Sequence, residues 1–323
     1  MRLATIRART HGFTVTPAQY ARVAYAALGA LTLIVLTGAA VRLTGSGLGC
    51  PDWPKCYGKD VPPLETHAVI EYSNRMITAL VTIAALSAAV VAWRRRPFRR
   101  DLALLGTLLP IGVFAQAVLG GFTVRGKLDY GFVMGHFALS MVLLLAGAAL
   151  VWRVRHAPGE RPRSSDRATV WAVRALVPLG ALTIFAGTAA TAAGPHAGGS
   201  PGQAINRLDI DGRGTLSWAI HQHGAIATAL GLTAVAVWLW LRRRRDADPL
   251  VERSVRAVAV LLAAQGVVGG VQYQLHLPSE IVWVHVGLAS GTWLAILWSA
   301  AAAGRLLPRA APARVAAEVG AGY

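Results

Sequence analysis

The sequence predicts an all-α membrane protein with eight transmembrane helices, and three observations support this class. Of the 323 residues, 54% are hydrophobic and only 15% are charged, with a mean hydropathy of +0.48. Apolar segments close to the roughly 20 residues that cross a bilayer recur along the chain. Basic residues gather at alternate connections between these segments. This composition excludes an ordinary soluble domain.

Eight segments have the length and composition of membrane spans. The first follows a basic start but no small-residue cleavage signature comes after it, so we expect a retained helix rather than a signal peptide. In chain order, the segments are 24–41, 67–93, 102–124, 132–152, 175–193, 216–241, 257–275 and 281–303.

The charges between the segments predict the orientation. With a cytoplasmic N-terminus, the inner side carries 24 Lys and Arg against 7 acidic residues, whereas the outer side carries 7 of each. Cytoplasmic loops of membrane proteins carry such an excess. The net charge of +17 is therefore explained by topology in the cell membrane, with both termini cytoplasmic, and does not indicate a nucleic-acid partner.

The chain aligns with itself at an offset of 149 residues. The sequence AQAVLGG at 115–121 meets AQGVVGG at 264–270. Because an even number of helices returns the chain to its starting side, we expect two parallel four-helix-bundle repeats related by a pseudo-twofold axis along the membrane normal. The expected organisation is an N-terminal repeat at 1–155, a cytoplasmic linker at 156–170 and a C-terminal repeat at 171–323.

Two histidines of the second repeat are candidate haem ligands. His223 and His285 lie in spans that both enter from the outer face, at a similar depth of roughly 6 to 10 Å. Two imidazoles from neighbouring helices suit the axial positions of a haem, and the alternative is a hydrogen-bonded pair of interior histidines. Intramembrane ionisable residues are usually functional, which favours the haem. We expect His221, on another helix face, and His276, in an outer turn, to lie outside this site.

The same offset gives the first repeat His136 and Asn74, because Asn74 aligns with His223. An amide is a poor iron ligand beside imidazole. The first site should therefore be weakly held, or open, on the side of Asn74.

A group of polar residues is specific to the first repeat. His67, Glu71, Asn74 and Arg75 share one face of the second span. The second repeat has Ile and Gly at the positions of Glu71 and Arg75. The two residues have the spacing of an intrahelical ion pair, but a carboxylate within a membrane span favours a role at a site. We expect the second repeat to keep a permanent cofactor and the first to carry out chemistry.

Cys50 and Cys56, the two cysteines of the chain, lie in the first outer loop. Disulfides persist outside the cytoplasmic membrane, so a disulfide is predicted over two free thiols.

Together these residues resemble the haem A synthase family over essentially the whole chain. The resemblance rests on the run VRLTGSGLGCPDWPKCYG, the segment EYSNR at 71–75, the Gly-Gly pairs that end the third and seventh spans, and the histidines at 136 and 285 with their preceding residues. The family's usual Glu-x-x-His-Arg motif has Asn74 in place of histidine here.

The resemblance implies an enzyme, a haem-dependent oxidoreductase that oxidises the C8 methyl of haem O to a formyl group, giving haem A for cytochrome c oxidase. It implies a haem b cofactor on His223 and His285 and a substrate haem on His136 near Asn74 and Arg75, with both sites toward the outer face. Glu71 would be catalytic, and Cys50 and Cys56 the family's paired cysteines. From its place on the same helix face, His67 is an alternative ligand in place of Asn74, although it lies about 10 Å further out.

The partners implied are haem O synthase, an unidentified electron-transfer partner and membrane lipid. Two other functions stay open at this point: a dihaem b-type electron carrier that leaves its haems unmodified, and a haem transporter.

Overall fold

The computed structural model describes residues 13–161, 164 and 166–307. Eight helices in this part of the chain are long and apolar enough to cross a membrane, which confirms the predicted all-α, eight-helix class. They are α1 Pro17–Leu43, α2 Thr66–Arg94, α3 Arg100–Arg125, α4 Tyr130–Arg155, α5 Arg167–Ala193, α6 Thr215–Arg243, α7 Pro249–Gln274 and α8 Ser279–Ala302, with the short 3-10 helix η1 Gly212–Gly214 before α6.

Local signals in the sequence set the helix starts. Thr16 and Gln19 form a capping box at α1, with Pro17 at its first position. Asp248 caps α7 with its side chain alone, which accepts a hydrogen bond from the Leu250 N–H at 2.8 Å. Asp166 caps α5 by accepting from Thr169, so this helix begins at Arg167 rather than after the predicted end of the linker at 170. Helices α2 and α4 run past their predicted spans into last turns that carry arginines, at Arg94 and Arg155, whereas α7 and α8 end one residue before their predicted ends.

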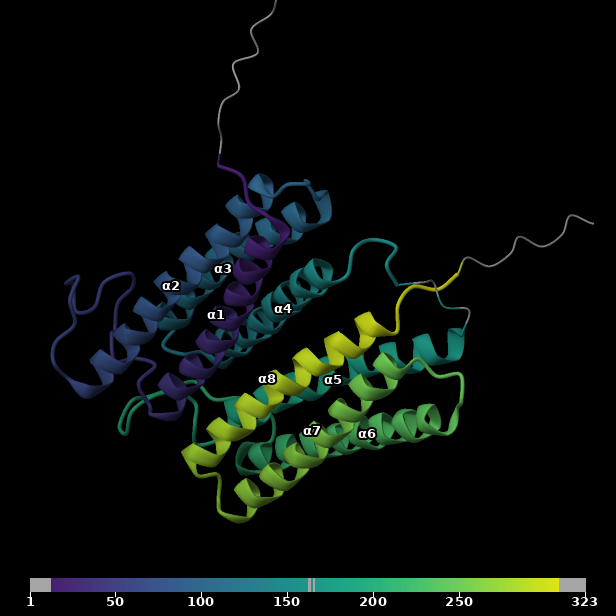
Figure 1. Cartoon of the computed structure of the whole chain (residues 1–323). Coiled ribbons are helices and arrows are strands. Elements are labelled where there is room, and N and C mark those ends of the chain that lie inside the picture. The colour runs from purple at the N-terminus through teal and green to yellow at the C-terminus, as the bar shows by residue number, and fades with distance from the viewer. Residues whose placement is uncertain (1–12, 162–163, 165, 308–323) are drawn as a thin grey trace, which may run out of the picture.

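Each half of the chain forms a cluster of neighbouring helices. In the first, α1 contacts α2 and α4, and α3 contacts α2 and α4; in the second, α5 contacts α6 and α8, and α7 contacts α6 and α8. Figure 1 shows the two clusters lying next to each other, with α4 and α8 where they meet. The bounds of α6 and α7 fall 149 residues after those of α2 and α3. The pseudo-twofold axis stays a prediction.

Small residues allow the helices of the first cluster to approach closely. A Cβ on Gly106 of α3 would lie 2.8 Å from the carbonyl oxygen of Ala88 on α2. Ala88 is fully buried, and so is Tyr20 of α1, whose hydroxyl donates to the Ala88 carbonyl at 3.3 Å. Small residues at such contacts are typical of membrane bundles, where van der Waals packing drives association.

Two tryptophans of α8 join the halves. The indole N–H of Trp293 donates to the Met141 carbonyl of α4 at 3.0 Å, and that of Trp283 donates to the Leu36 carbonyl of α1 at 2.9 Å. The two clusters therefore meet through directed contacts as well as apolar packing. The expected cytoplasmic termini fall on residues 1–12 and 308–323, outside the described residues.

Candidate functional site

A carboxylate is buried near the start of α2. Glu71 is only 6% exposed. Its Oε2 accepts a hydrogen bond from the backbone N–H of Cys50 at 2.7 Å, and its Oε1 accepts one from Arg75 Nη2 at 2.5 Å. The i, i+4 ion pair considered from the sequence is therefore present. Because Cys50 lies outside the helix, the carboxylate is also tied to the preceding loop.

That loop, residues 50–56, is called the disulfide loop below. Cys50 and Cys56 are bonded with an S–S distance of 2.03 Å, and both are fully buried. The Asp52 carboxylate accepts hydrogen bonds from the backbone N–H groups of Tyr57 at 2.6 Å and Gly58 at 2.7 Å. These donors, Gly58 above all, hold the pKa of Asp52 below its ordinary value. The loop is thus closed by a covalent bond, and the Asp52 carboxylate ties it to the two residues that follow it.

The disulfide loop packs over the ends of two helices. Arg75 of α2 donates to backbone carbonyls within it. The ring of Trp53 lies against Gly121 of α3, where an added Cβ would stand 2.9 Å from the ring. Arg125, also of α3, reaches the Trp53 carbonyl at 3.5 Å. Only glycine at 121 allows this close approach, so the loop covers the region where α2 begins and α3 ends.

In the second half, the imidazoles of His223 and His285 face each other. His223 on α6 and His285 on α8 have ring centroids 6.1 Å apart and ring planes inclined by 74°. The Nδ1 of His223 lies 3.0 Å from the Thr183 carbonyl oxygen on α5. Because a carbonyl only accepts, Nδ1 carries the proton, which leaves Nε2 with a free lone pair. A backbone carbonyl in this role is typical of metal-binding histidines.

These two residues fit the axial positions of a haem. A metal held between two imidazoles at about 2 Å from each nitrogen places the ring centroids about 6 Å apart, close to the observed 6.1 Å. The His285 Nδ1 is buried and has no hydrogen-bond partner among the described residues. Glycines lie beside both rings, where a Cβ on Gly187 or Gly269 would stand 3.0 Å or 3.3 Å from the histidine Cε1.

His136 repeats this arrangement on α4. Its Nδ1 is buried without a hydrogen-bond partner in the described part of the chain. A Cβ on Gly120 would stand 3.5 Å from the His136 Cε1, and a Cβ on Gly269 would stand 3.3 Å from the His285 Cε1. The two histidines therefore occupy equivalent environments, but His136 has no imidazole opposite it at the position of Asn74.

The Asn74 side chain is bonded to α1. Its Oδ1 accepts a hydrogen bond from the Thr37 hydroxyl at 2.8 Å, the only side-chain hydrogen bond of Asn74 among residues 13–161, 164 and 166–307. The amide oxygen, the atom that could contact a metal, therefore already accepts one hydrogen bond from α1.

The other candidate histidines lie apart from the facing pair. His67 Nδ1 is 2.9 Å from the Ser46 hydroxyl, at the entry to the disulfide loop. His221 Nδ1 lies 2.6 Å from the Ser217 carbonyl on the exposed side of α6. His276 adopts a positive φ of 62° in the turn between α7 and α8. The expected placement of His221 and His276 agrees with these contacts.

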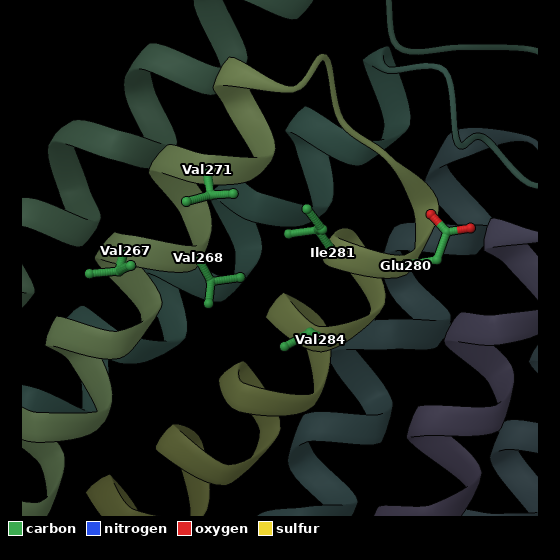
Figure 2. Close-up of a pocket in the computed structure, with 6 residues that line it drawn as sticks. All are labelled: Val267, Val268, Val271, Glu280, Ile281 and Val284. Carbon is green, nitrogen blue, oxygen red and sulfur yellow. The ribbon is translucent and has the colours of Figure 1, made fainter.

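A groove with mostly apolar lining lies between α7 and α8 (Figure 2). It is lined by Val267, Val268, Val271, Glu280, Ile281 and Val284. In the first half, the positions of Val271 and Ile281 are taken by Phe122 and Phe132, whose rings stack with centroids 6.1 Å apart. Two larger side chains thus fill the corresponding space. Since Val267 is 68% exposed, the groove belongs to the lipid-facing surface of the helices.

Sequence reasoning missed several residues that hold the histidines. Gln116 Nε2 donates to the His136 carbonyl at 3.0 Å, and Gln265 Nε2 donates to the His285 carbonyl at 3.2 Å. Both glutamines stand in the duplicated AQ sequence, so the repeat alignment contained a signal for them. Thr37 and Thr183 carried no such signal, because their contacts depend on which helices become neighbours.

Known proteins match the chain as follows. A family model described as cytochrome oxidase assembly protein matches residues 21–297. A heme A synthase of Lysinibacillus sphaericus is 37% identical over 126 residues, 38% of this chain and 41% of that protein. A heme A synthase of Bacillus pumilus is 36% identical over 123 residues, 36% of this chain and 40% of that protein. A protoheme IX farnesyltransferase of Thermus thermophilus is 31% identical over 304 residues, 89% of this chain and 49% of that protein.

The chain spans about two fifths to one half of the length of these curated relatives. The family model, by contrast, extends from α1 into α8. It includes the disulfide loop, Glu71, His136 and the facing pair His223 and His285. The chain belongs to the family of cytochrome oxidase assembly proteins.

Proposed function

We propose that the chain is a haem A synthase, which oxidises the C8 methyl of haem O to the formyl group of haem A. The observation that carries this proposal is the difference between the two halves. One half has a pair of facing histidines, and the other has one such histidine together with a buried carboxylate. Relatives named heme A synthase add support.

Glu71 is the proposed catalytic residue. Oxidation of a methyl group removes hydrogen equivalents from carbon, and a carboxylate beside that carbon takes up a proton or stabilises positive charge there. Glu71 is ionisable, buried and held by two hydrogen bonds, which fixes its position. The second half has Ile220 at the equivalent position and is not expected to perform this step.

His223 and His285 are the proposed ligands of a haem b cofactor. When bound, this haem would supply one-electron transfer. The protein's contribution is to orient the two imidazoles, through the Thr183 carbonyl at His223 and through the Gln265 bond to the His285 backbone.

His136 is the proposed iron ligand of the substrate haem, with Asn74 opposite and Arg75 nearby on the face of α2. A haem with one imidazole ligand breaks one strong iron bond on leaving, whereas a haem with two must break both. The first half is therefore suited to a haem that enters as substrate and leaves as product.

We also propose an orientation and a partner. The excess of Lys and Arg at one end of the helices supports cytoplasmic termini and an outward-facing disulfide loop. The Thermus relative is named for attaching a farnesyl group to protohaem, and half of its length aligns with this chain. This supports haem O synthase as the protein that supplies the substrate. An electron-transfer partner is also proposed, because forming the formyl group from the methyl with water as the oxygen source releases four electrons and four protons.

The experiment is to express the chain with haem O synthase and to analyse the acid-extracted haem by chromatography and mass spectrometry. We expect haem A, or its hydroxymethyl precursor, from the unmodified protein. Glu71→Gln retains size and hydrogen-bonding capacity but removes the charge, so it should bind haem and yield no formyl product. Haem A in wild-type amounts from this variant would contradict the role of Glu71. If the unmodified protein yields only haem b, the dihaem electron carrier is the better assignment.

A further inference from the structure

Arg75 joins the disulfide loop to the buried carboxylate. Its Nη1 donates to the carbonyl oxygens of Lys55 at 2.8 Å and Pro54 at 3.2 Å. Its Nη2 donates to the carbonyl oxygen of Asp52 at 3.1 Å and to Glu71 Oε1 at 2.5 Å. Each terminal nitrogen of a guanidinium carries two hydrogens. All four terminal N–H groups are therefore in use within the protein.

Glu71 completes the connection from the other side. Its second oxygen, Oε2, accepts the N–H of Cys50 at 2.7 Å, at the first residue of the disulfide loop. The loop, Arg75 and Glu71 thus form a closed ring of contacts. Arg75 binds the loop at three carbonyls, and Glu71 binds it at one amide.

Because Arg75 and Glu71 are largely buried, breaking only some of the contacts between them and the loop is energetically costly. The side chains of Arg75 and Glu71 are 17% and 8% exposed. Removing one member of a buried ion pair leaves an uncompensated charge on the other, which destabilises much more than loss of an exposed pair. Cys50 and Cys56 are fully buried beneath the same contacts. A reagent can reach the disulfide only when the loop lifts.

We propose that Arg75 is a positioning residue that makes the disulfide loop and the Glu71 carboxylate move as one unit. When the loop lifts, Glu71 loses its Cys50 donor and its ion pair together. When the loop closes, both are restored and the carboxylate is fixed. The four terminal N–H groups serve this task, which leaves the Nε–H as the remaining donor of the guanidinium. The proposed function gives this coupling its purpose, since Glu71 is the proposed catalytic residue.

The test measures how fast the disulfide is reduced in the purified full chain. Dithiothreitol supplies two electrons and two protons to the Cys50–Cys56 bond and is itself oxidised to a cyclic disulfide. The two thiols are counted by alkylation and mass spectrometry. Arg75→Gln should accelerate reduction at least about tenfold, because charge-assisted hydrogen bonds are the stronger class. Arg75→Lys keeps the charge but not the planar four-donor arrangement, so its rate should lie in between.

The matched control is Arg125→Gln, because Arg125 reaches the same loop through one longer bond to the Trp53 carbonyl at 3.5 Å. Its rate should stay within about twofold of the unmodified protein, since a single hydrogen bond as long as this one contributes little.

A double-mutant cycle separates coupling from a local clamp. If Arg75 and Glu71 act as one unit, Arg75→Gln combined with Glu71→Gln should be reduced no faster than the faster single variant. If the two substitutions increase the reduction rate by factors that multiply, or if Arg75→Gln leaves the rate unchanged, the proposal is overturned.

Hydrogen exchange tests the same point in the unmodified protein, without relying on any variant. The amide of Cys50 is held by Glu71. If the loop and the carboxylate open as one unit, the Cys50 amide and the disulfide become accessible in the same event, so the opening equilibrium from Cys50 exchange should match the one from the reduction rate. A Cys50 amide that opens much more often than the disulfide becomes reducible would contradict the proposal. Neither readout requires haem chemistry, so each stands even if the proposed enzymatic function fails.

Discussion

His223 on α6 and His285 on α8 face each other with ring centroids 6.1 Å apart. The residues lie 62 positions apart in the sequence, and Asn74 and His136 lie the same number of positions apart in the first half. The first half therefore offers one imidazole where the second offers two.

Loss of either facing histidine should remove the proposed haem b from the second half. We expect His223→Ala and His285→Ala to lose the low-spin b-type absorption of the purified protein, because each removes one of two axial ligands. His221→Ala is the matched control, since His221 is exposed on the same helix and bonded to Ser217. A low-spin signal retained in both ligand variants would contradict the assignment of His223 and His285 as haem b ligands.

Glycine at 187 should be required for the position of the His223 ring. A Cβ on Gly187 would stand 3.0 Å from His223 Cε1, so Gly187→Ala must displace the imidazole, at a cost of about 1–3 kcal/mol. We expect a weakened or shifted low-spin spectrum and a lower thermal midpoint. In Gly224→Ala on α6, the added methyl meets no atom within 4 Å, so the spectrum should stay unchanged and the thermal midpoint should not fall, because alanine favours the helix over glycine. Equal effects of the two substitutions would contradict a specific contact at the ring.

Asn74 should leave the substrate haem with one strong protein ligand. Its amide oxygen accepts a hydrogen bond from the Thr37 hydroxyl at 2.8 Å, and an amide is a poor iron ligand beside imidazole. Asn74→His introduces a second imidazole, so a high-spin or mixed-spin signal of the first site should become low-spin, as electron paramagnetic resonance would show. Asn74→Ala, the control, should leave the spin state of the unmodified protein. Two low-spin bis-imidazole haems in the unmodified protein would point to another ligand, and His67→Ala would then identify it.

The disulfide should form in the purified protein and stabilise the disulfide loop. Unreduced protein should resist alkylation at Cys50 and Cys56 in mass spectrometry, and the intact mass should be about 2 Da below that of the dithiol. Closing so short a loop contributes about 2 kcal/mol in the chain-entropy account, so Cys50→Ser with Cys56→Ser should lower stability by that order. Two alkylated thiols in the unreduced protein would disprove the pairing.

The sequence by itself determined the class of the molecule and its candidate residues. Hydropathy depends on composition over about 20 neighbouring residues, so the eight spans could be found without knowing any contact. The offset of 149 residues likewise required only comparison of the chain with itself, and it paired His136 with His285 and Asn74 with His223. Glu71 stood out because a carboxylate within an apolar segment is rare.

The tertiary structure decided how these residues are held. The bonds from Thr37 to Asn74 and from Thr183 to His223 join different helices, and no local pattern specifies which helix faces become neighbours. The sequence offered an ion pair or a functional site as alternative readings of Glu71 and Arg75. The fold places both residues in contact with the disulfide loop, because the loop returns over the start of α2 and covers them. Such contacts depend on the path of the loop in space, which the order of residues along the chain does not reveal.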